Sequence, residues 1–201
     1  MKTESLEKLK ESLAGDLKLD ALSKALYATD ASVYRKTPLA VAFPKDTADV
    51  KKIILFAQEH NIGIIPRTAG TSLAGQCVGE GIVVDVSKHF TNIISFNESK
   101  MQITVQPGVI RDELNQYLAP YGMFFGPNTS TANRCMLGGM VGNNSSGTTS
   151  IQYGVTRDKV VHLKTILANG DEVEFKSLTS QEFTAKLNEH TFEASLYKNI
   201  H

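Results

Sequence analysis

The sequence predicts an α+β fold made of two packed subdomains. Up to about residue 90, short apolar strands alternate with amphipathic helices, a pattern typical of partly parallel strands joined by crossovers. After Lys88 the strands follow one another closely, as in antiparallel hairpins. The join lacks linker composition, so we expect tight packing. We divide the chain into an N-terminal helical segment (1–30), a first subdomain (31–90) and a second subdomain (91–201).

The first half contains two predicted helices and three predicted strands. Residues 3–28 are predicted to be helical, with a break at Gly15-Asp16, because leucines recur at helical spacing: Leu6, Leu9, Leu13, Leu19, Leu22 and Leu26. A second helix is expected from the N-cap Asp46 to about His60, with Asp49 in its first turn. Its buried face would contain Val50, Ile53, Ile54 and Ala57. Apolar runs predict strands at 39–43, 62–66 and 82–85.

The second half is predicted to consist mainly of hairpins. Strands at 92–97 and 101–106 flank a polar turn, and a helix follows at 110–118 with Leu114 and Leu118 on one side. A second hairpin is expected between 161–167 and 172–175, because Asn169-Gly170 is a two-residue turn signal. Residues 180–190 are predicted to be helical.

Composition excludes several classes of protein. The 201 residues include 21 basic and 21 acidic side chains, and this balance argues against nucleic acid as a partner. The two cysteines, Cys77 and Cys135, favour a reducing compartment, and the five histidines show no metal-binding spacing. No apolar run reaches the roughly 20 residues of a membrane span, and the N-terminus lacks an apolar signal core. We expect a cytoplasmic protein, with peripheral membrane association as the alternative.

The first glycine-rich segment is Pro66–Gly75. Gly70 and Gly75 have the GxxxxG spacing of a phosphate loop, but Gln76 and Cys77 stand where that motif requires Lys and then Ser or Thr. A nucleoside triphosphatase is therefore not supported. The chain also lacks a GxGxxG motif after a strand, so the nicotinamide dinucleotide fold is not supported.

The donors of this segment suit an internal pyrophosphate. Thr68, Thr71 and Ser72 supply hydroxyls, the glycines expose backbone N–H groups, and Arg67 is the one cation at the edge. The structural alternative is a glycine-rich turn that only reverses the chain.

The second glycine-rich segment is Leu137–Gly147. It combines glycines with Asn143, Asn144, Ser145 and Ser146, whose amides and hydroxyls can read the edge of a heteroaromatic ring. A surface loop is the structural alternative, but the interleaved Met140 and Val141 argue against a fully solvated one. The two segments together predict one long ligand gripped at two points, such as a dinucleotide.

Seven short motifs, taken in their order along the chain, resemble those of a known family. Between about Ala31 and Phe175 the chain resembles the FAD-binding domain (PCMH-type) of the vanillyl-alcohol oxidase and p-cresol methylhydroxylase family, in particular its D-lactate dehydrogenase and glycolate oxidase branch. The motifs that match are RTAGTSLAG (67–75), IVVD (82–85), VQPG (105–108), GPNTS (126–130), GGMVGNNSSG (138–147), YGVTRD (153–158) and ANG (168–170). The resemblance implies two α+β subdomains with FAD extended between them.

The resemblance also implies a set of cofactor-binding residues. It assigns the first segment to FAD, with residues 67–72 on the pyrophosphate and Gln76 near the isoalloxazine or ribityl part: Pro66, Arg67, Thr68, Ala69, Gly70, Thr71, Ser72 and Gln76. Pro127 and Ser130 would line the flavin. The ribityl, pyrophosphate and adenosine parts would contact Gly138, Gly139, Asn143, Ser146 and Gly147, with Tyr153, Gly154 and Val160 continuing that wall.

Two departures from the family pattern affect the expected chemistry. Asn128 stands where the family often has an acid. Thr71 stands where members with covalent flavin often have histidine, so we expect noncovalent FAD. Cys135 is expected to be a buried structural thiol.

The resemblance implies the FAD-binding part of a flavin-dependent dehydrogenase or oxidase. Its expected substrate is a D-2-hydroxy acid of the lactate, glycolate or 2-hydroxyglutarate class, oxidised by hydride transfer to flavin N5. The alternatives are a sugar or alcohol oxidase or an enolpyruvyl-sugar reductase of the same fold, and a non-catalytic nucleotide-binding module. We identify no catalytic base, no carboxylate clamp and no electron acceptor in the sequence, so we expect an N-terminal fragment of a longer enzyme with little turnover of its own.

Overall fold

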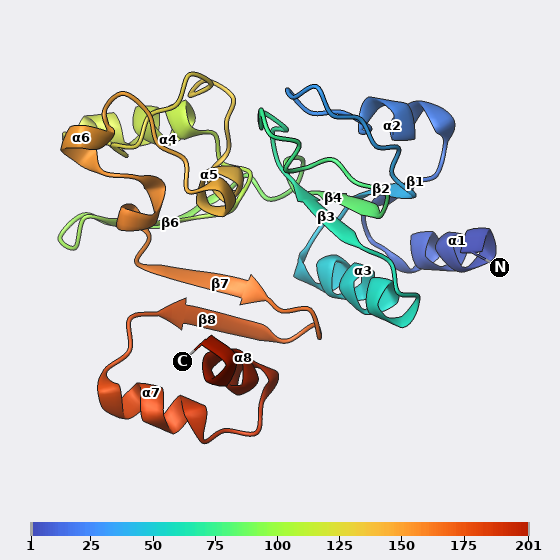
Figure 1. Ribbon diagram of the computed structural model, residues 1–201. Coiled ribbons are helices and arrows are strands. Elements are labelled where there is room, and N and C mark those ends of the chain that lie inside the picture. The colour runs from blue at the N-terminus through green and yellow to red at the C-terminus, as the bar shows by residue number, and fades with distance from the viewer. Residues whose placement is uncertain (1, 201) are drawn as a thin grey trace. The chain divides into compact units, whose positions relative to one another are not determined.

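The computed structural model describes residues 2–200 and divides into two compact units, Met1–Lys159 and Val160–His201 (Figure 1). Each unit is described by itself. In the first unit the elements are, in chain order, α1 (Lys2–Ser12), β1 (Asp16–Lys18), α2 (Ala21–Leu26), β2 (Ala40–Phe43), α3 (Thr47–Glu59), β3 (Ile64–Arg67), β4 (Ile82–Asp85), β5 (Ile93–Asn97), β6 (Gln102–Val105), α4 (Arg111–Leu118), η1 (Ala119–Tyr121), α5 (Leu137–Asn143), α6 (Ser150–Tyr153) and η2 (Thr156–Lys159).

A four-stranded sheet with the order β1-β2-β4-β3 organises the first part of this unit. Strands β2, β4 and β3 are parallel, and β1 pairs with β2 in the antiparallel direction. Helices α1 and α3 bury Leu6, Leu9 and Ile53 against the alternate strand residues Ala42 and Val84. As predicted, Asp46 caps α3 by accepting a hydrogen bond from the backbone N–H of Asp49 (3.0 Å).

The prediction of a helix over 3–28 is wrong at its centre. Asp16–Lys18 forms β1, because pairing with Phe43 and Val41 of β2 satisfies a short segment that has no helical partner. Leu6, Leu9 and Leu13 are buried as expected, whereas Leu22 and Leu26 of α2 are 70% and 65% exposed.

A second hydrophobic cluster lies farther along the first unit. Helices α4 and α5 and the residues just before them contribute its buried residues: Val109, Leu114, Leu118, Cys135, Leu137 and Met140. The antiparallel pair β5 and β6 packs partly buried side chains against this cluster: Ile93, Phe96, Ile103 and Val105. The first seven residues of the second glycine-rich segment form helix α5, for which no secondary structure was predicted, because burial of Leu137 and Met140 holds them in a helix. The domain boundary proposed near residue 90 stays a prediction.

The second unit contains β7 (His162–Ile166), β8 (Glu172–Lys176), α7 (Ser180–Leu187) and α8 (Phe192–Ile200). The predicted hairpin is confirmed, but its turn differs: Gly170 N donates to Leu167 O (2.9 Å), and among the turn residues 168–170 only Gly170 has a positive φ (84°). This is the three-residue type, in which glycine follows a type I turn. Helix α7 matches the helix predicted over 180–190, and α8 was not predicted.

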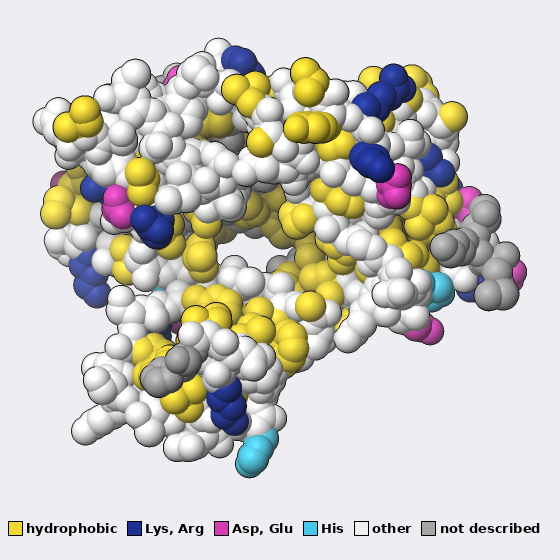
Figure 2. Space-filling view, in the orientation of Figure 1, with side chains coloured by type: hydrophobic (Ala, Val, Ile, Leu, Met, Phe, Trp, Pro, Cys, Tyr) yellow, Lys and Arg dark blue, Asp and Glu magenta, His cyan; other side chains and the backbone are white. Residues whose placement is uncertain are grey.

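Charged side chains of both signs are interspersed on the face of the molecule that Figure 2 shows. None of the helices in the described part of the chain is both long and apolar enough to cross a bilayer.

Candidate functional site

The first glycine-rich segment leaves the carboxyl end of β3 without regular secondary structure. Its backbone turns at Gly70, whose φ of +65° is the left-handed region that favours glycine. Ala31 N donates to Gly70 O (3.2 Å), which ties the turn to the connection between α2 and β2. The Ser72 hydroxyl accepts hydrogen bonds from Ala74 N (3.1 Å) and Gln76 N (3.3 Å) and so closes the far end of the segment.

Arg67 is anchored beneath this turn. Its Nη1 donates to Thr29 O (2.8 Å), and its guanidinium lies 4.9 Å from the centre of the Tyr27 ring. The Tyr27 hydroxyl in turn donates to Asp85 Oδ2 (2.6 Å). Burial and the Asp85 carboxylate raise the pKa of the Tyr27 phenol above its ordinary value, so the phenol stays a donor. Arg67 and Asp85 are paired in register on neighbouring strands, and this holds the whole group together.

Asp85 acts as a cap at the end of β4. It is only 4% exposed, and its Oδ1 accepts a hydrogen bond from Ser87 N (2.7 Å) while Oδ2 accepts from Tyr27. Both oxygens of this buried carboxylate are therefore occupied by protein donors.

The second glycine-rich segment consists of α5 and the turn that follows it. Gly138 N donates to Pro107 O (2.8 Å), which fixes the helix against the end of β6. Asn144 ends the helix in the left-handed conformation, with φ +51°. Beyond it, Thr156 donates from its N (3.0 Å) and its Oγ1 (2.6 Å) to Ser145 O, so a buried threonine holds the turn.

The two glycine-rich segments meet in space, although Gln76 and Asn143 are 67 positions apart in the chain. Gln76 Nε2 donates to Asn143 Oδ1 (2.7 Å), and Asn143 Nδ2 donates to Ser145 Oγ (3.0 Å). Thr68 and Gly139 also face one another, since a Cβ placed on Gly139 would lie 2.8 Å from Thr68 Oγ1. The two segments therefore lie close enough together for one ligand to contact both, and the binding of such a ligand stays a prediction.

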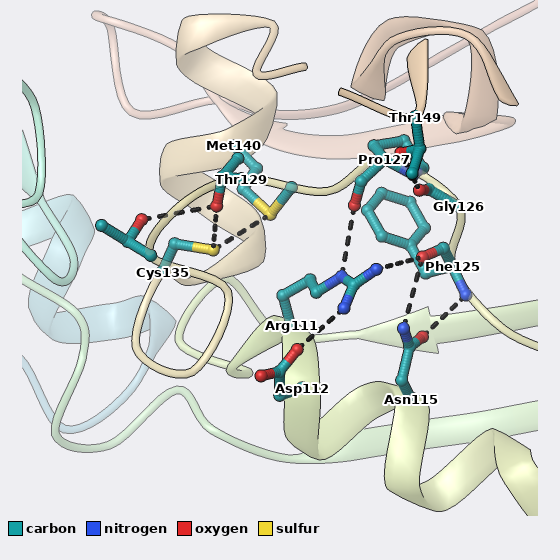
Figure 3. A network of polar contacts seen from close by, with 11 residues as sticks. Arg111, Asp112, Asn115, Phe125, Gly126, Pro127, Thr129, Cys135, Met140 and Thr149 are labelled. Carbon is teal, nitrogen blue, oxygen red and sulfur yellow. Dashed lines mark hydrogen bonds and ion pairs between the residues drawn. The ribbon is translucent and has the colours of Figure 1, made fainter. Parts of the chain in front are cut away.

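A third segment, residues 125–131, borders the second. The Gly147 backbone packs directly on the Asn128 carbonyl, because a Cβ on Gly147 would come within 1.8 Å of that oxygen. Thr149 Oγ1 donates to Gly126 O (3.1 Å) (Figure 3). On the opposite side, Arg111 and Asn115 of α4 bind the backbone of the same segment.

Three rows of backbone amides have no protein acceptor within residues 2–200. They are the N–H groups of residues 68–73, 128–131 and 146–149. Backbone N–H groups without acceptors are a ready site for anionic oxygens, and the first row follows Arg67 directly. The arrangement can therefore hold a doubly charged phosphate linkage without a lysine.

The two cysteines are structural rather than exposed. Cys135 is 5% exposed and contacts Thr129 Oγ1 (3.2 Å) and Met140 Sδ (3.6 Å), as expected for a buried thiol. Cys77 donates to Asp30 Oδ2 (3.6 Å), and burial raises the pKa of its thiol. In the described part of the chain, no group of three His, Cys, Asp or Glu side chains has an arrangement able to hold a metal ion.

The structure places most residues of the predicted site in these three segments. Of the predicted residues, Gln76 hydrogen-bonds Asn143 across the segments and Thr68 faces Gly139. Gly147 packs on the carbonyl of Asn128, a residue outside the predicted set. Tyr153, at the end of α6, covers Gly126. Ser130 and Ser146 are exposed, and Val160 begins the second unit, so its position relative to the site is not described.

Four residues that hold the site residues or their backbone in place were not predicted from the sequence. Tyr27, Arg111, Asn115 and Thr149 all bind or stack on site residues or their backbone. No spacing signal marks them, because Tyr27 meets Asp85 across 58 positions and the other three bind carbonyls.

Comparisons with known proteins place these observations in a family. A family model described as FAD binding domain matches residues 38–176. D-2-hydroxyglutarate dehydrogenases are 42% identical over 84% of this chain in Escherichia coli and 40% identical over 83% in Haemophilus influenzae. Glycolate oxidase subunit GlcD of Bacillus subtilis is 37% identical over 74% of this chain. The chain spans only 17%, 16% and 32%, respectively, of the length of these relatives.

Solved structures confirm the α+β fold. Alkyldihydroxyacetonephosphate synthase superposes with a TM-score of 0.77 at 21% identity, covering 90% of this chain and 36% of that one. p-Cresol methylhydroxylase with substrate bound superposes with a TM-score of 0.74 at 17% identity, covering 86% of this chain and 35% of that one.

Proposed function

Because the chain belongs to the FAD binding domain family, we propose that its three converging segments bind FAD and serve the oxidation of a D-2-hydroxy acid. The observation that carries the proposal is the meeting of two glycine-rich segments through Gln76 and Asn143, with rows of unpaired amides on both sides. A dinucleotide is long enough to be held at both segments, and its pyrophosphate suits amide donors.

Two features of the site suit FAD: the charge of Arg67, and a backbone that a ligand can approach closely. Residues 68–73 supply successive N–H donors beside the anchored Arg67, which suits the pyrophosphate. Gly139 and Gly147 leave no room for a side chain at the points where the segments approach one another. We assign the remaining predicted contacts of the first unit to the same cofactor: Pro66, Gln76, Pro127, Ser130, Gly138, Asn143, Ser146, Tyr153 and Gly154. Val160, which begins the second unit, is assigned from the family resemblance alone.

The described residues bind and orient rather than react. The chemistry that FAD supplies when bound is acceptance of a hydride equivalent at N5 from the α-carbon of the substrate. Arg67 offsets phosphate charge, and Gln76 and Asn143 fix the separation of the two gripping segments. Residues 125–131 form the wall beside the second glycine-rich segment.

The substrate class is proposed from the relatives. Those at 40% and 42% identity are named for D-2-hydroxyglutarate, and others for glycolate and D-lactate. A D-2-hydroxy acid is the feature that these names share. Sugar or alcohol oxidation of the same fold is tested by offering both substrate classes with oxygen or a dye as acceptor.

Titration of the cofactor-free chain with FAD tests the binding proposal. We expect saturable binding that quenches flavin fluorescence. Gly139→Leu, which puts a side chain between the segments opposite Thr68, should weaken the affinity at least about tenfold. Gly142→Leu, three residues along α5 with nothing within 4 Å of the added Cβ, should bind like the parent chain. Equal affinities in the two variants would place FAD elsewhere.

We propose further that FAD is held noncovalently. Thr71 has no nucleophilic ring nitrogen for a flavin bond, and the Cys135 thiol is buried against Thr129 and Met140. Acid precipitation of the yellow protein should leave the flavin in the supernatant. Colour that stays with the precipitated polypeptide would contradict the proposal.

A further inference from the structure

An irregular backbone segment supports the second half of the proposed cofactor site. Residues 123–129 adopt neither helix nor strand, yet Gly126 and Pro127 are buried. Buried backbone groups need hydrogen-bond partners, and an irregular segment has no regular ladder to provide them. On one side of the segment these partners are side chains of α4 (Figure 3).

Arg111 and Asn115 lie one turn apart on α4 and grip the segment at neighbouring carbonyls. Arg111 Nε donates to Pro127 O (3.2 Å), and its Nη2 donates to Phe125 O (3.3 Å). Asn115 Oδ1 accepts from Phe125 N (2.7 Å), and its Nδ2 donates to Phe125 O (3.4 Å). The two side chains therefore fix the position and the orientation of residues 125–127.

The opposite side of the same segment contacts the second glycine-rich segment. Gly147 packs on the Asn128 carbonyl, and Thr149 Oγ1 binds Gly126 O. Because these contacts are close, a displacement of residues 125–128 requires a displacement of residues 147–149. The position of α4 therefore determines, through residues 125–128, the positions of two of the three rows of unpaired amides.

The Arg111 guanidinium is held by hydrogen bonds and an ion pair within the protein. Its side chain is only 14% exposed, and Nη1 binds Asp112 Oδ1 (2.8 Å) while Nε and Nη2 bind carbonyls. This arrangement leaves no guanidinium edge directed at a ligand carboxylate. Arg111 is therefore not the missing substrate clamp.

We propose that Arg111 and Asn115 are positioning residues for the cofactor, setting the register of residues 125–128 and hence of the amides at 128–131 and 146–149. The inference rests on the proposed FAD site. Arginine is suited to this role because its planar fork can bind two carbonyls at once, whereas lysine is a point charge.

The test compares Arg111→Met with a core variant of the same helix. Leu114→Val also destabilises α4, but Leu114 is buried in the hydrophobic cluster and makes no polar contact with the segment. For both variants of the 201-residue chain we would measure thermal unfolding, FAD affinity well below the unfolding temperature, the visible circular dichroism of bound flavin, and hydrogen exchange of residues 125–131.

Arg111→Met should weaken FAD binding about tenfold, change the flavin circular dichroism and accelerate exchange across 125–131. Leu114→Val should lower the unfolding temperature. It should leave the FAD affinity, the flavin circular dichroism and the hydrogen exchange of residues 125–131 as in the parent chain. The same profile in both variants would overturn the proposal, because a purely structural arginine would act only through stability.

Milder changes keep the test decisive if Arg111→Met does not fold. Arg111→Lys retains the charge without the fork, and Asn115→Asp keeps the acceptor for Phe125 N but loses the donor to Phe125 O. Each should raise the FAD dissociation constant and speed local exchange, and parent-like values in both would overturn the proposal. If the parent chain binds no FAD, the proposed function fails, while the exchange contrast still decides whether the two residues position the segment.

Discussion

At the scale of single residues, Asp49 shows how one buried carboxylate joins three parts of the chain. It is 1% exposed, and its oxygens accept hydrogen bonds from the backbone N–H groups of Ala14 (2.9 Å), Gly15 (2.8 Å) and Lys45 (3.0 Å). Burial alone would raise the pKa of this carboxyl, but the three backbone donors outweigh it and hold the pKa below its ordinary value.

Asp49→Asn should lower the free energy of unfolding by about 1–3 kcal/mol at neutral pH, because its amide N–H₂ group would face a backbone donor. A carboxyl with a lowered folded pKa stabilises the protein above its unfolded pKa and loses that contribution as pH falls through the folded pKa. Urea unfolding between pH 7 and 3 should therefore show a smaller acid-side loss in the variant.

Asp46→Asn is the matched control on the same helix. Asp46 caps α3 at an exposed position, and asparagine is an equally good N-cap, so its effect should be within about 0.5 kcal/mol. If Asp49→Asn and Asp46→Asn lower the free energy of unfolding equally, the backbone contacts of Asp49 do not explain the loss of stability.

The ring and the hydroxyl of Tyr27 make two different contributions to the site. Its ring supports the Arg67 guanidinium, and its hydroxyl binds Asp85. Tyr27→Phe should reduce stability, because a buried carboxylate loses a donor, but should keep FAD affinity. Tyr27→Leu should also raise the FAD dissociation constant about two- to fivefold, because the cation–π contact of roughly 0.5–1 kcal/mol is lost.

Fluorescence titrations and urea unfolding on both Tyr27 variants distinguish these effects. Equal FAD affinities in Tyr27→Phe and Tyr27→Leu would show that Arg67 does not need the ring. The contact with Thr29 O would then be sufficient to hold the guanidinium.

At the scale of elements, α5 owes its helical form to packing rather than to propensity. It contains Gly138, Gly139 and Gly142, which disfavour a helix, but Leu137 and Met140 are buried. The close approach of Gly138 to Pro107, where an added Cβ would lie 2.5 Å from the proline Cβ, is a packing reason for one of these glycines.

Two alanine substitutions on α5 should therefore have opposite signs. Gly142→Ala adds a methyl in open space and should stabilise the protein by up to about 1 kcal/mol through helix propensity. Gly138→Ala should destabilise it, because the added methyl meets Pro107 and forces the backbone apart. Thermal unfolding of the pair checks the signs, and stabilisation by both would contradict the packing argument.

The elements predicted correctly from the sequence are those specified by their own residues. Strand β4 begins with the three buried apolar residues Ile82, Val83 and Val84, and α3 has both periodicity and a cap. Strand β1 was missed because its three residues become a strand only through pairing with β2, which lies beyond the next helix. In the same way the glycine-rich segments were visible, whereas Arg111 was not, because its partners are carbonyls that any residue provides.

At the scale of the whole molecule, the described residues account for cofactor binding better than for turnover. Groups with shifted pKa values have structural partners: Asp49 binds backbone amides, Glu182 completes the capping box of α7, and Lys186 pairs with Glu193. Catalysis requires a base within reach of the substrate hydroxyl and a cation for its carboxylate. Within residues 2–200 neither is assigned at the three converging segments.

We therefore expect this chain to bind FAD but to oxidise D-2-hydroxy acids far more slowly than about 1 per second, the lower end of ordinary enzyme turnover. A dye-linked assay with D-2-hydroxyglutarate, D-lactate and glycolate at saturating FAD measures this. Reduction of the bound flavin by dithionite and its reoxidation by the dye would first show that electron transfer itself works. Turnover of the order of 1 per second, which is within the range of ordinary enzymes, would contradict the expectation and place the base and the clamp among these residues.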